Sequence, residues 1–449
     1  MTAPPFVLKK TQSLCPTCLK RVPATVVLRD GAVWMDKSCP DHLHFSVQLA
    51  SDPQHYRVAR ADVEALGSCC GPGRHCGDQI ANHSCNMLIE LTQQCNLSCP
   101  TCYASSSPHN TEFMAFEKFT ATIDGLVEKG KGDADLIQLS GGEPTLHPRI
   151  FDCVEYALTA GIKQVYINTN GIKLANRKFV ERLAVFGDRL SIYLQFDGFD
   201  PKTYDKLRGD DQLLAKKQRA IAHCEDLGIT VVPIVTLTAG INDHEIGAIL
   251  EMAAKSEGSI RKVMVHPAMY SGRYQNPRHV KRADTSQAIN AICEQSGVFI
   301  PDDFGPIPCS DPQCFSLAVA LRTRNGLVPI SRYFPKYETW SDPANAALIT
   351  SVTDTFDTVT DLQSVIGWVA SSGALQALGD DALDALLDEL QAADGGWGGL
   401  FVIGIKPFMD AWSYDQDRID KCCVHIISKD GTPVSFCEYN ALWRPQGRR

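Results

Sequence analysis

The stretch Cys95-Asn-Leu-Ser-Cys99-Pro-Thr-Cys102-Tyr103 decides how this sequence is interpreted. Its three thiols, separated by three and by two residues, can ligate three irons of a four-iron cluster. The fourth iron then has no protein ligand and is open to a small molecule that chelates it. The stretch therefore predicts a catalytic 4Fe-4S cluster with Cys95, Cys99 and Cys102 as its ligands.

Around this stretch, short apolar runs alternate with longer helical patterns. Strands are expected at residues 87–91, 135–139, 164–168, 190–196, 229–237 and 261–266, and helices at 116–128, 150–160, 175–185, 212–227 and 243–254. Alternation of this kind gives parallel strands joined by crossover helices. We therefore expect an α/β fold, a partial (β/α) barrel whose active face is formed by the loops after the strands.

The segment Ser140-Gly-Gly-Glu-Pro144 follows the second of these expected barrel strands. Its glycines permit a ligand to approach the backbone closely, and the carboxylate of Glu143 can hold an ammonium group. Together with the cysteine motif one strand earlier, this segment resembles the radical S-adenosylmethionine (SAM) superfamily. The resemblance covers residues 95–267.

The resemblance implies a cofactor and a set of residues that bind it. SAM would chelate the open iron through its amino and carboxylate groups, and its reductive cleavage would yield a 5′-deoxyadenosyl radical that removes a hydrogen atom from the substrate. The electron would come from a donor such as flavodoxin or ferredoxin. Gly141, Gly142 and Glu143 would bind the methionine amino group. Polar residues near the ends of the later strands would touch the ribose or carboxylate, namely Asn168, Asn170, Gln195, Asp197 and Thr236.

Composition narrows the class of protein. The chain has 449 residues and a net charge of −9, which argues against a protein that grips nucleic acid through phosphate contacts. The first residues show no secretory signal, and no apolar run approaches the roughly 20 residues that span a bilayer. We therefore expect a cytoplasmic protein. In that reducing compartment the 18 cysteines serve as metal ligands and not as disulfides.

The first cysteine group predicts a single metal ion near the N-terminus. Cys15-Pro-Thr-Cys18 and Cys39-Pro-Asp-His42 provide two ligand pairs on short turns. Such pairs suit a tetrahedral zinc or a rubredoxin-like iron. The alternative is that His42, like His44 beside it, is a solvated loop histidine and the fourth ligand is missing.

Two further groups predict two auxiliary iron–sulfur clusters. Cys69, Cys70, Cys76 and Cys85 lie in a glycine- and proline-containing loop, where the alternative is free thiols in a linker. The other group combines Cys309 and Cys314 with Cys422, Cys423 and Cys437, of which one of the adjacent pair would be a spectator. This cluster would clip the C-terminal region onto the barrel. Cys153, Cys224 and Cys293 stand alone and are expected to be core thiols.

These patterns divide the chain into four expected regions. They are a metal knuckle at residues 1–60, an auxiliary cluster loop at 61–86, the partial barrel at 87–270 and an auxiliary-cluster domain at 271–449. A leucine stripe at residues 383, 386, 387 and 390 indicates that the last region is helical.

Across its whole length the chain resembles the tetraether lipid synthase family, whose relatives are also labelled dihydropterin methyltransferases. The four cysteine groups carry this resemblance, including the terminal Lys421-Cys-Cys-Val-His425. It implies hydrogen abstraction from an unactivated sp3 carbon of a lipid-like or small apolar substrate, with carbon–carbon bond formation. Residues 395–409 would then line an apolar channel or form a buried strand. The basic residues 278–282 would meet a phosphate head group, with peripheral membrane contact, or form a solvated face.

Two other functions stay open. One is a radical methyltransferase that acts on a pterin-like small molecule, although no cobalamin-binding segment is evident. The other is a non-catalytic iron–sulfur electron carrier or zinc-organised interaction protein. The Gly-Gly-Glu segment at residues 141–143 speaks against the non-catalytic alternative.

Overall fold

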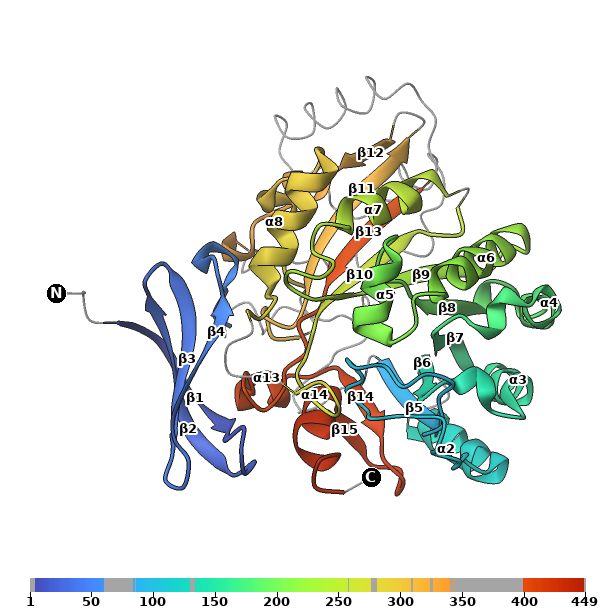
Figure 1. The fold of residues 1–449 in the computed structure, drawn as a ribbon, viewed down its shortest axis with the longest axis horizontal. Helices are drawn as coiled ribbons and strands as arrows, with labels where there is room; N and C mark the ends of the chain where they lie inside the picture. Colours follow the sequence, from blue (N-terminus) through green and yellow to red (C-terminus); the bar gives the residue numbers. More distant parts are fainter. Residues whose placement is uncertain are drawn as a thin grey trace.

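The fold is that of a computed structural model, which describes residues 5–59, 84, 86–129, 134–256, 258–275, 281–307, 310–323, 326–339, 342 and 399–447. Two β-sheets and the helices that pack on the larger one make up these residues (Figure 1). Several predictions fall outside the described residues: Cys69, Cys70, Cys76, Cys85 and Cys309, the basic residues 278–280, residues 395–398, and the leucine stripe at Leu383, Leu386, Leu387 and Leu390.

The N-terminal sheet has four antiparallel strands in chain order. They are β1 (Phe6–Leu14), β2 (Arg21–Arg29), β3 (Ala32–Cys39) and β4 (Leu43–Ala50). Asp30 and Gly31 join β2 to β3 with φ angles of 52° and 73°, the left-handed conformation that a tight hairpin turn needs. Val26, Val33 and Met35 form a small core on one face of the sheet. In Figure 1 this sheet lies apart from the barrel helices.

The larger sheet has eleven strands, and its centre confirms the predicted partial barrel. Six parallel strands follow one another in chain order: β5 (Asn86–Thr92), β6 (Ala134–Gly141), β7 (Ile162–Thr169), β8 (Leu190–Gln195), β9 (Thr230–Leu237) and β10 (Lys262–Pro267). Their side chains form one continuous hydrophobic core with those of the crossover helices. The crossover helices thus cover the outer face of the parallel strands.

The crossover helices agree with the sequence pattern. They are α2 (Phe116–Lys129), α3 (Ile150–Ala160), α4 (Arg177–Ala184), α6 (Leu213–Asp226) and α7 (Ile246–Lys255). Two helices were not predicted, α5 (Pro201–Arg208) and α8 (Thr285–Ser296). Asp200 caps α5 by accepting from the Lys202 amide, and Gly209 ends it in the left-handed conformation. Short 3-10 helices occur at Pro53–His55, Pro144–Leu146, Lys173–Ala175, Gly187–Arg189, Pro301–Asp303, Ser331–Tyr333 and Tyr337–Thr339.

Strands from the C-terminal region extend the sheet at both ends. At one end β13 (Leu400–Ile405) pairs in parallel with β10 and is followed by β11 (Ser316–Thr323) and β12 (Gly326–Pro329). At the other end β14 (Val424–Ile427) pairs in parallel with β5 and is followed by β15 (Pro433–Ser435). The strand β13 confirms the buried-strand alternative for its segment. The expected helical C-terminal domain did not include the other strands, and their places in the sheet join residues far apart in sequence. The helical residues here are α13 (Gln416–Asp420), α14 (Phe436–Glu438) and a π-helix at Tyr439–Trp443.

The N-terminal sheet packs on the segment that follows β13. The Trp412 ring meets the Phe45 ring edge-on, with centroids 5.7 Å apart. The buried Lys37 on β3 donates from Nζ to the carbonyl oxygens of Ala411 and Trp412, at 2.8 and 2.7 Å. Thr11 on β1 donates to the Asp415 carboxylate at 2.8 Å. The small sheet is therefore fastened to residues that continue directly from the barrel.

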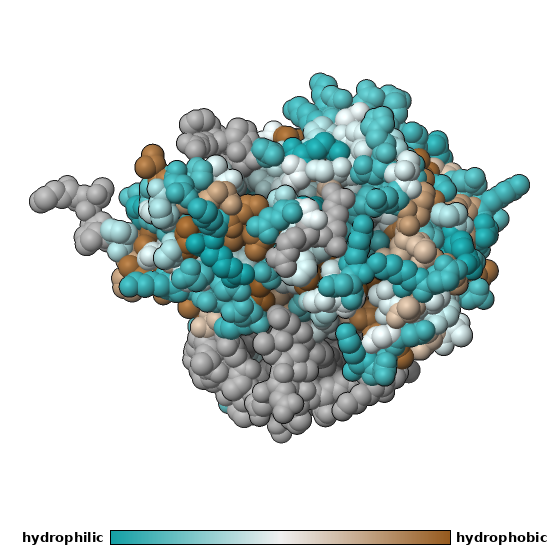
Figure 2. Space-filling view, turned by 90° about the horizontal axis from the view of Figure 1, so that it is seen from below, coloured by the Kyte–Doolittle hydropathy of each residue, from teal (hydrophilic) through white to brown (hydrophobic). Residues whose placement is uncertain are grey.

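Among the described residues, none of the helices is long and apolar enough to cross a membrane. On the face shown in Figure 2, hydrophobic residues lie scattered among hydrophilic ones. Among the described residues, the most exposed large hydrophobic side chain is Leu43, the first residue of β4, at 81% exposure.

Candidate active site

A cavity of about 310 Å³ lies at the carboxyl ends of the parallel strands, where the pattern predicts the active face. Its wall contains residues from β5 to β10 and from the loops that follow them. Nearly all of the predicted barrel site residues line it: Cys95, Cys99, Cys102, Gly141, Gly142, Glu143, Asn168, Asn170, Gln195 and Thr236. Asp197 is the exception, because it lies behind the wall and is fully buried.

The three cysteines of the motif share one loop after β5 and face this cavity. Burial raises the pKa of the Cys95 thiol to about 12, and the charge of Glu143 adds to the shift. The Asn170 side-chain amide donates to the Cys95 sulfur at 3.9 Å. Three thiols on one loop beside a cavity fit a four-iron cluster with one open iron, and binding as thiolates would release their protons.

Gly141 and Gly142 serve the loop itself. A Cβ atom at Gly141 would lie 2.1 Å from the Thr92 carbonyl oxygen, and one at Gly142 would lie 2.2 Å from that of Gln94. The amide of Gly142 donates to Thr92 at 2.8 Å. The sequence predicts glycines here for approach to a ligand, whereas the structure uses them for close approach to the start of the cysteine loop.

The Glu143 carboxylate is already supplied with hydrogen-bond donors. It accepts from the Thr145 amide and hydroxyl at 3.2 and 2.6 Å, from the Thr169 hydroxyl at 2.7 Å and from the Asn170 amide at 2.8 Å. Burial raises its pKa, while these hydrogen bonds favour the charged form. These donors tie the carboxylate to the ends of β6 and β7, and because Glu143 also lines the cavity, its contact with the methionine ammonium stays a prediction.

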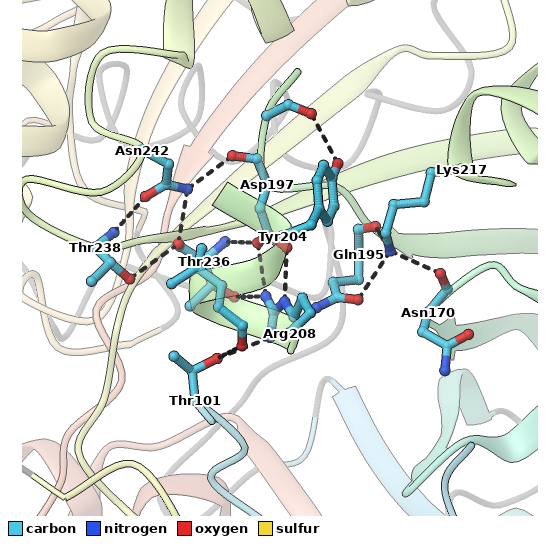
Figure 3. A network of polar contacts seen from close by, with 12 residues as sticks. Thr101, Asn170, Gln195, Asp197, Tyr204, Arg208, Lys217, Thr236, Thr238 and Asn242 are labelled. Atoms are coloured by element: carbon cyan, nitrogen blue, oxygen red, sulfur yellow. Dashed lines mark hydrogen bonds and ion pairs between the residues drawn. The ribbon is translucent and has the colours of Figure 1, made fainter. Parts of the chain in front are cut away.

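A buried ion pair lies behind the β8 and β9 part of the wall (Figure 3). Arg208, at the end of α5, donates to both carboxylate oxygens of Asp197 at 2.8 and 2.7 Å and to the Thr236 hydroxyl at 2.8 Å. It also donates to the Thr101 hydroxyl, inside the cysteine loop, at 3.2 Å. Asp197 thus pairs with Arg208 and does not itself reach the cavity, so the ligand contact predicted for Asp197 is corrected to Arg208, which does line it.

A second buried cation joins β7 to β8. Lys217 on α6 donates from Nζ to the carbonyl oxygens of Asn170 and Gln195, at 2.8 and 2.7 Å, as Figure 3 shows. It also donates to the Gln195 side-chain oxygen at 3.0 Å. Burial lowers the pKa of Lys217 to about 8. This lysine therefore fixes the two strand ends that carry the predicted ligand contacts Asn170 and Gln195.

The cysteine loop is held from the other side by the turn after β10. Arg273 donates to the carbonyl oxygens of Cys99 and Ser106, at 3.0 and 2.6 Å. Gly272 has a φ of +61°, and a Cβ there would lie 2.3 Å from the Tyr103 carbonyl oxygen. The turn consequently packs directly against the loop, and no side chain other than hydrogen fits at Gly272.

The N-terminal sheet brings four predicted ligands together. The ligand atoms of Cys15, Cys18, Cys39 and His42 all lie within 4.8 Å of one another, and no other such group of three or more occurs among the described residues. The Cys18 and Cys39 sulfurs are 3.8 Å apart, and His42 Nδ1 lies 3.7 Å from the Cys15 sulfur. Zinc at about 2.3 Å from each sulfur places two ligands of a tetrahedron about 3.8 Å apart. The donor set and its spacing fit one zinc ion.

Three C-terminal thiols influence one another electrostatically, although their ligand atoms do not all lie within 4.8 Å of one another as those of the ribbon do. Burial raises the pKa of Cys437 to about 12, and the charges of Cys422 and Cys314 act in the same direction. Burial likewise raises the pKa of Cys314, with Cys422 contributing and Arg418 opposing. Cys423 packs in the hydrophobic cluster with Val424 and Ile426.

Known families match both parts of the chain. Residues 89–253 match the family described as the radical SAM superfamily. The chain contains a radical SAM domain. Residues 7–51 match the HMPTM N-terminal zinc ribbon domain, in agreement with the Cys15–His42 site. The protein is accordingly a radical SAM iron–sulfur enzyme with an N-terminal zinc ribbon.

Relatives of this radical SAM enzyme include one that matches almost end to end. A Methanocaldococcus jannaschii protein named 7,8-dihydro-6-hydroxymethylpterin dimethyltransferase is 28% identical over 485 residues, covering 98% of this chain and 94% of its own. The Bacillus subtilis protein AlbA, named for biosynthesis of the antilisterial bacteriocin subtilosin, is 28% identical over 50% of this chain and 48% of its own. Among solved structures, Streptococcus suis SuiB bound to S-adenosylmethionine is similar over 45% of this chain and 44% of its own. The identity is 17% and the TM-score is 0.35.

Several residues of the radical SAM site were not predicted from the sequence. Arg208 and Arg273 lie on a short helix and a turn that the periodicity does not reveal. Lys217 does have a signal, because it shares the apolar face of α6 with Leu213 and Cys224. A lysine on such a face needs buried acceptors, which this one finds at the cavity wall.

Proposed function

We propose that this radical SAM enzyme is a methyltransferase that acts on a pterin-like heterocycle. The observation that carries the proposal is the similarity over nearly the whole chain, zinc ribbon included, to the M. jannaschii pterin dimethyltransferase. This similarity supports the methyltransferase alternative better than it supports lipid coupling.

The cavity supports the same choice. Its volume of about 310 Å³ is at the lower end of the range for small-molecule sites. Its wall includes the amides of Gln138, Asn168 and Gln195 and the cations of Arg208 and Lys406. Asn168 donates to Gln138 and Arg208 donates to Asp197, so these groups already have partners within the protein. The choice therefore rests on the volume, which suits a compact substrate better than two lipid chain ends.

Within this proposal the residues of the chain hold and shield the reacting groups. Cys95, Cys99 and Cys102 would ligate a 4Fe-4S cluster, which supplies the electron for cleavage of SAM. Arg273 and the Glu143 network keep the loop in place. Cys314, Cys422 and Cys437 would ligate an auxiliary cluster, with Cys423 as the spectator.

The test is product analysis with the full chain. The protein is reconstituted anaerobically with iron and sulfide, reduced, and incubated with SAM and 6-hydroxymethyl-7,8-dihydropterin. The expected result is 5′-deoxyadenosine, S-adenosylhomocysteine from the SAM molecules that donate methyl groups, and a pterin that has gained those methyl groups, all detected by mass spectrometry. A parallel arm with a lipid extract checks the coupling alternative. Cleavage of SAM with coupled lipid and unaltered pterin would overturn the proposal.

A further inference from the structure

Asn170 lies in the turn after β7, beside the cysteine loop. Its main-chain amide donates to the Glu143 carboxylate at 2.8 Å, and its carbonyl oxygen accepts from Lys217 Nζ at 2.8 Å. The residue lines the cavity and is only 8% exposed. The main chain of Asn170 is therefore held from two sides, so that its side chain leaves the turn in a fixed direction.

The orientation of the Asn170 side-chain amide is set by its partners. Oδ1 accepts from the main-chain amide of Ile172 at 3.0 Å, a turn that asparagine commonly forms with the residue two places on. Nδ2 therefore faces the cysteine loop, where it donates to Asn96 Oδ1 at 2.7 Å and to the Cys95 sulfur at 3.9 Å. The reverse orientation would set Nδ2 against the Ile172 N–H, so only this one satisfies the partners. An N–H donor is thus directed at the first sulfur of the motif.

The sulfur that receives this hydrogen bond lies in an unfavourable place for a thiolate. Cys95 is buried, and the charge of Glu143 adds to the rise in its pKa that burial causes. A hydrogen bond with the main chain of Leu97 acts in the opposite direction. Each N–H donor to the sulfur offsets part of the free energy that a buried, negatively charged ligand costs. The Asn170 amide adds one such donor to that of Leu97.

Reduction makes this donor more important. When the radical SAM cluster is bound, one electron from a ferredoxin-like donor takes it from the 2+ to the 1+ state and makes its thiolates more negative. We propose that Asn170 is a positioning residue that raises the reduction potential of this cluster through its hydrogen bond to Cys95. The donor stabilises the sulfur more strongly in the more negative state, and so favours reduction. This inference does not depend on which substrate the enzyme methylates.

The test is a redox titration of the full chain, reconstituted anaerobically with iron and sulfide. Electron paramagnetic resonance (EPR) measures the reduced fraction, and the signal that SAM alters in a separate sample identifies the radical cluster. The titration itself is made without SAM, so that the predicted contact between Asn170 and SAM does not contribute. Asn170→Leu has a similar volume but no donor, and should lower the equilibrium constant for reduction about three- to ten-fold. For one electron, ten-fold corresponds to about 59 mV.

Two further variants sharpen the titration. Asn170→Asp keeps an acceptor for the Ile172 amide but turns a carboxylate oxygen toward the sulfur, so it should lower the potential further than Asn170→Leu. The matched control is Gln164→Leu, which removes an amide at the opposite end of β7 that donates to Ser191 at 3.1 Å. This control should titrate as the wild type does.

A spectroscopic measurement keeps the test independent of how well the variants assemble. Pulsed EPR of the reduced wild type, labelled with 15N in its asparagine side-chain amides, should show a 15N coupling to the radical cluster. Asn170→Asp, which lacks that nitrogen, should lose the coupling. Unchanged potentials in both Asn170 variants at full iron content, or a wild type without the coupling, would overturn the proposal. If neither variant assembles its cluster, the wild-type coupling decides. Because no pterin is present, either outcome leaves the proposed methyltransferase function unaffected.

Discussion

The zinc ribbon and the cysteine loop hold metal ligands in opposite ways. In the ribbon, the four ligand atoms of Cys15, Cys18, Cys39 and His42 already lie within 4.8 Å of one another on two turns of a small sheet. In the radical SAM domain the three thiols share one loop and are spread around a cavity. The ribbon therefore closes on its metal, whereas the loop keeps one side open.

The difference shows where each site obtains its rigidity. The ribbon is ordered by its own hairpins and by the metal at their base. The cysteine loop is held in place by surrounding elements. These are the Glu143 network at the ends of β6 and β7, Arg208 on α5 and Arg273 after β10. The ligands of the ribbon site can be predicted from two short motifs in the sequence. The contacts that hold the cysteine loop cannot, because they come from residues far apart in the chain.

Removing the thiols of the open site should have the largest effect. Cys95→Ala, Cys99→Ala and Cys102→Ala combined should abolish formation of 5′-deoxyadenosine and lower the iron content by about one four-iron cluster. The zinc content should stay unchanged, because the ribbon is separate. Chromatography of the nucleoside and metal analysis measure both, with the buried core thiol variant Cys153→Ala as control. Undiminished cleavage in the triple variant would defeat the assignment.

Removing one ligand of the zinc ribbon should affect the stability of the protein more than the formation of 5′-deoxyadenosine. Cys18→Ser should release the ribbon metal and lower the melting temperature, since a structural zinc contributes folding free energy. The absorbance of the radical cluster should remain. The half-buried Cys293→Ser serves as control. Full retention of zinc in the Cys18 variant would mean that the four residues do not form the site.

A third comparison separates two adjacent thiols. Cys422→Ala, like Cys314→Ala or Cys437→Ala, should lower the iron content while some 5′-deoxyadenosine still forms without productive turnover. Cys423→Ala should keep its iron, because Cys422 and not Cys423 contributes to the raised pKa of both Cys314 and Cys437. Iron counting and product yield test the difference. Equal iron loss in the Cys422 and Cys423 variants would remove the distinction, and normal product yield from the Cys437 variant would leave that cluster without a catalytic role.

The smallest expected effect concerns Lys217 and pH. Its pKa is about 8 in the folded protein and about 10.4 when unfolded, so between these values the unfolded chain binds more protons. Its contribution to stability therefore rises as pH rises from 8 to 10 and is constant below that window. The melting temperature of the wild type relative to Lys217→Met should increase over this range, with Lys216→Met as the control on the same helix. A difference that does not change with pH would contradict the assigned shift.

The sequence alone predicts those parts of the fold and the site that depend on short local patterns. The cysteine motif, the six barrel strands, the buried strand β13 and the Cys15–His42 site follow from spacing and alternation, and the structure contains them. The sequence did not predict β14 or the pairing of β13, because their partners β5 and β10 lie about 340 and 140 residues away and no local pattern encodes such pairing. For the same reason Lys406 was placed only near a channel or strand. The hydrogen bonds to Glu143 were not predicted, because its four donors come from two different strand ends.

The short stretch from Lys406 to Asp415 has a practical meaning for anyone who wants a smaller catalyst. One end of it forms the cavity wall, and the other end carries the Trp412 ring and the carbonyl oxygens that Lys37 holds. Deleting residues 5–51 to shorten the enzyme would uncover Trp412 and strip two main-chain acceptors of their ammonium partner. The smallest active fragment should therefore contain both the barrel and the N-terminal sheet. A truncated protein without that sheet should not be used to measure substrate affinity.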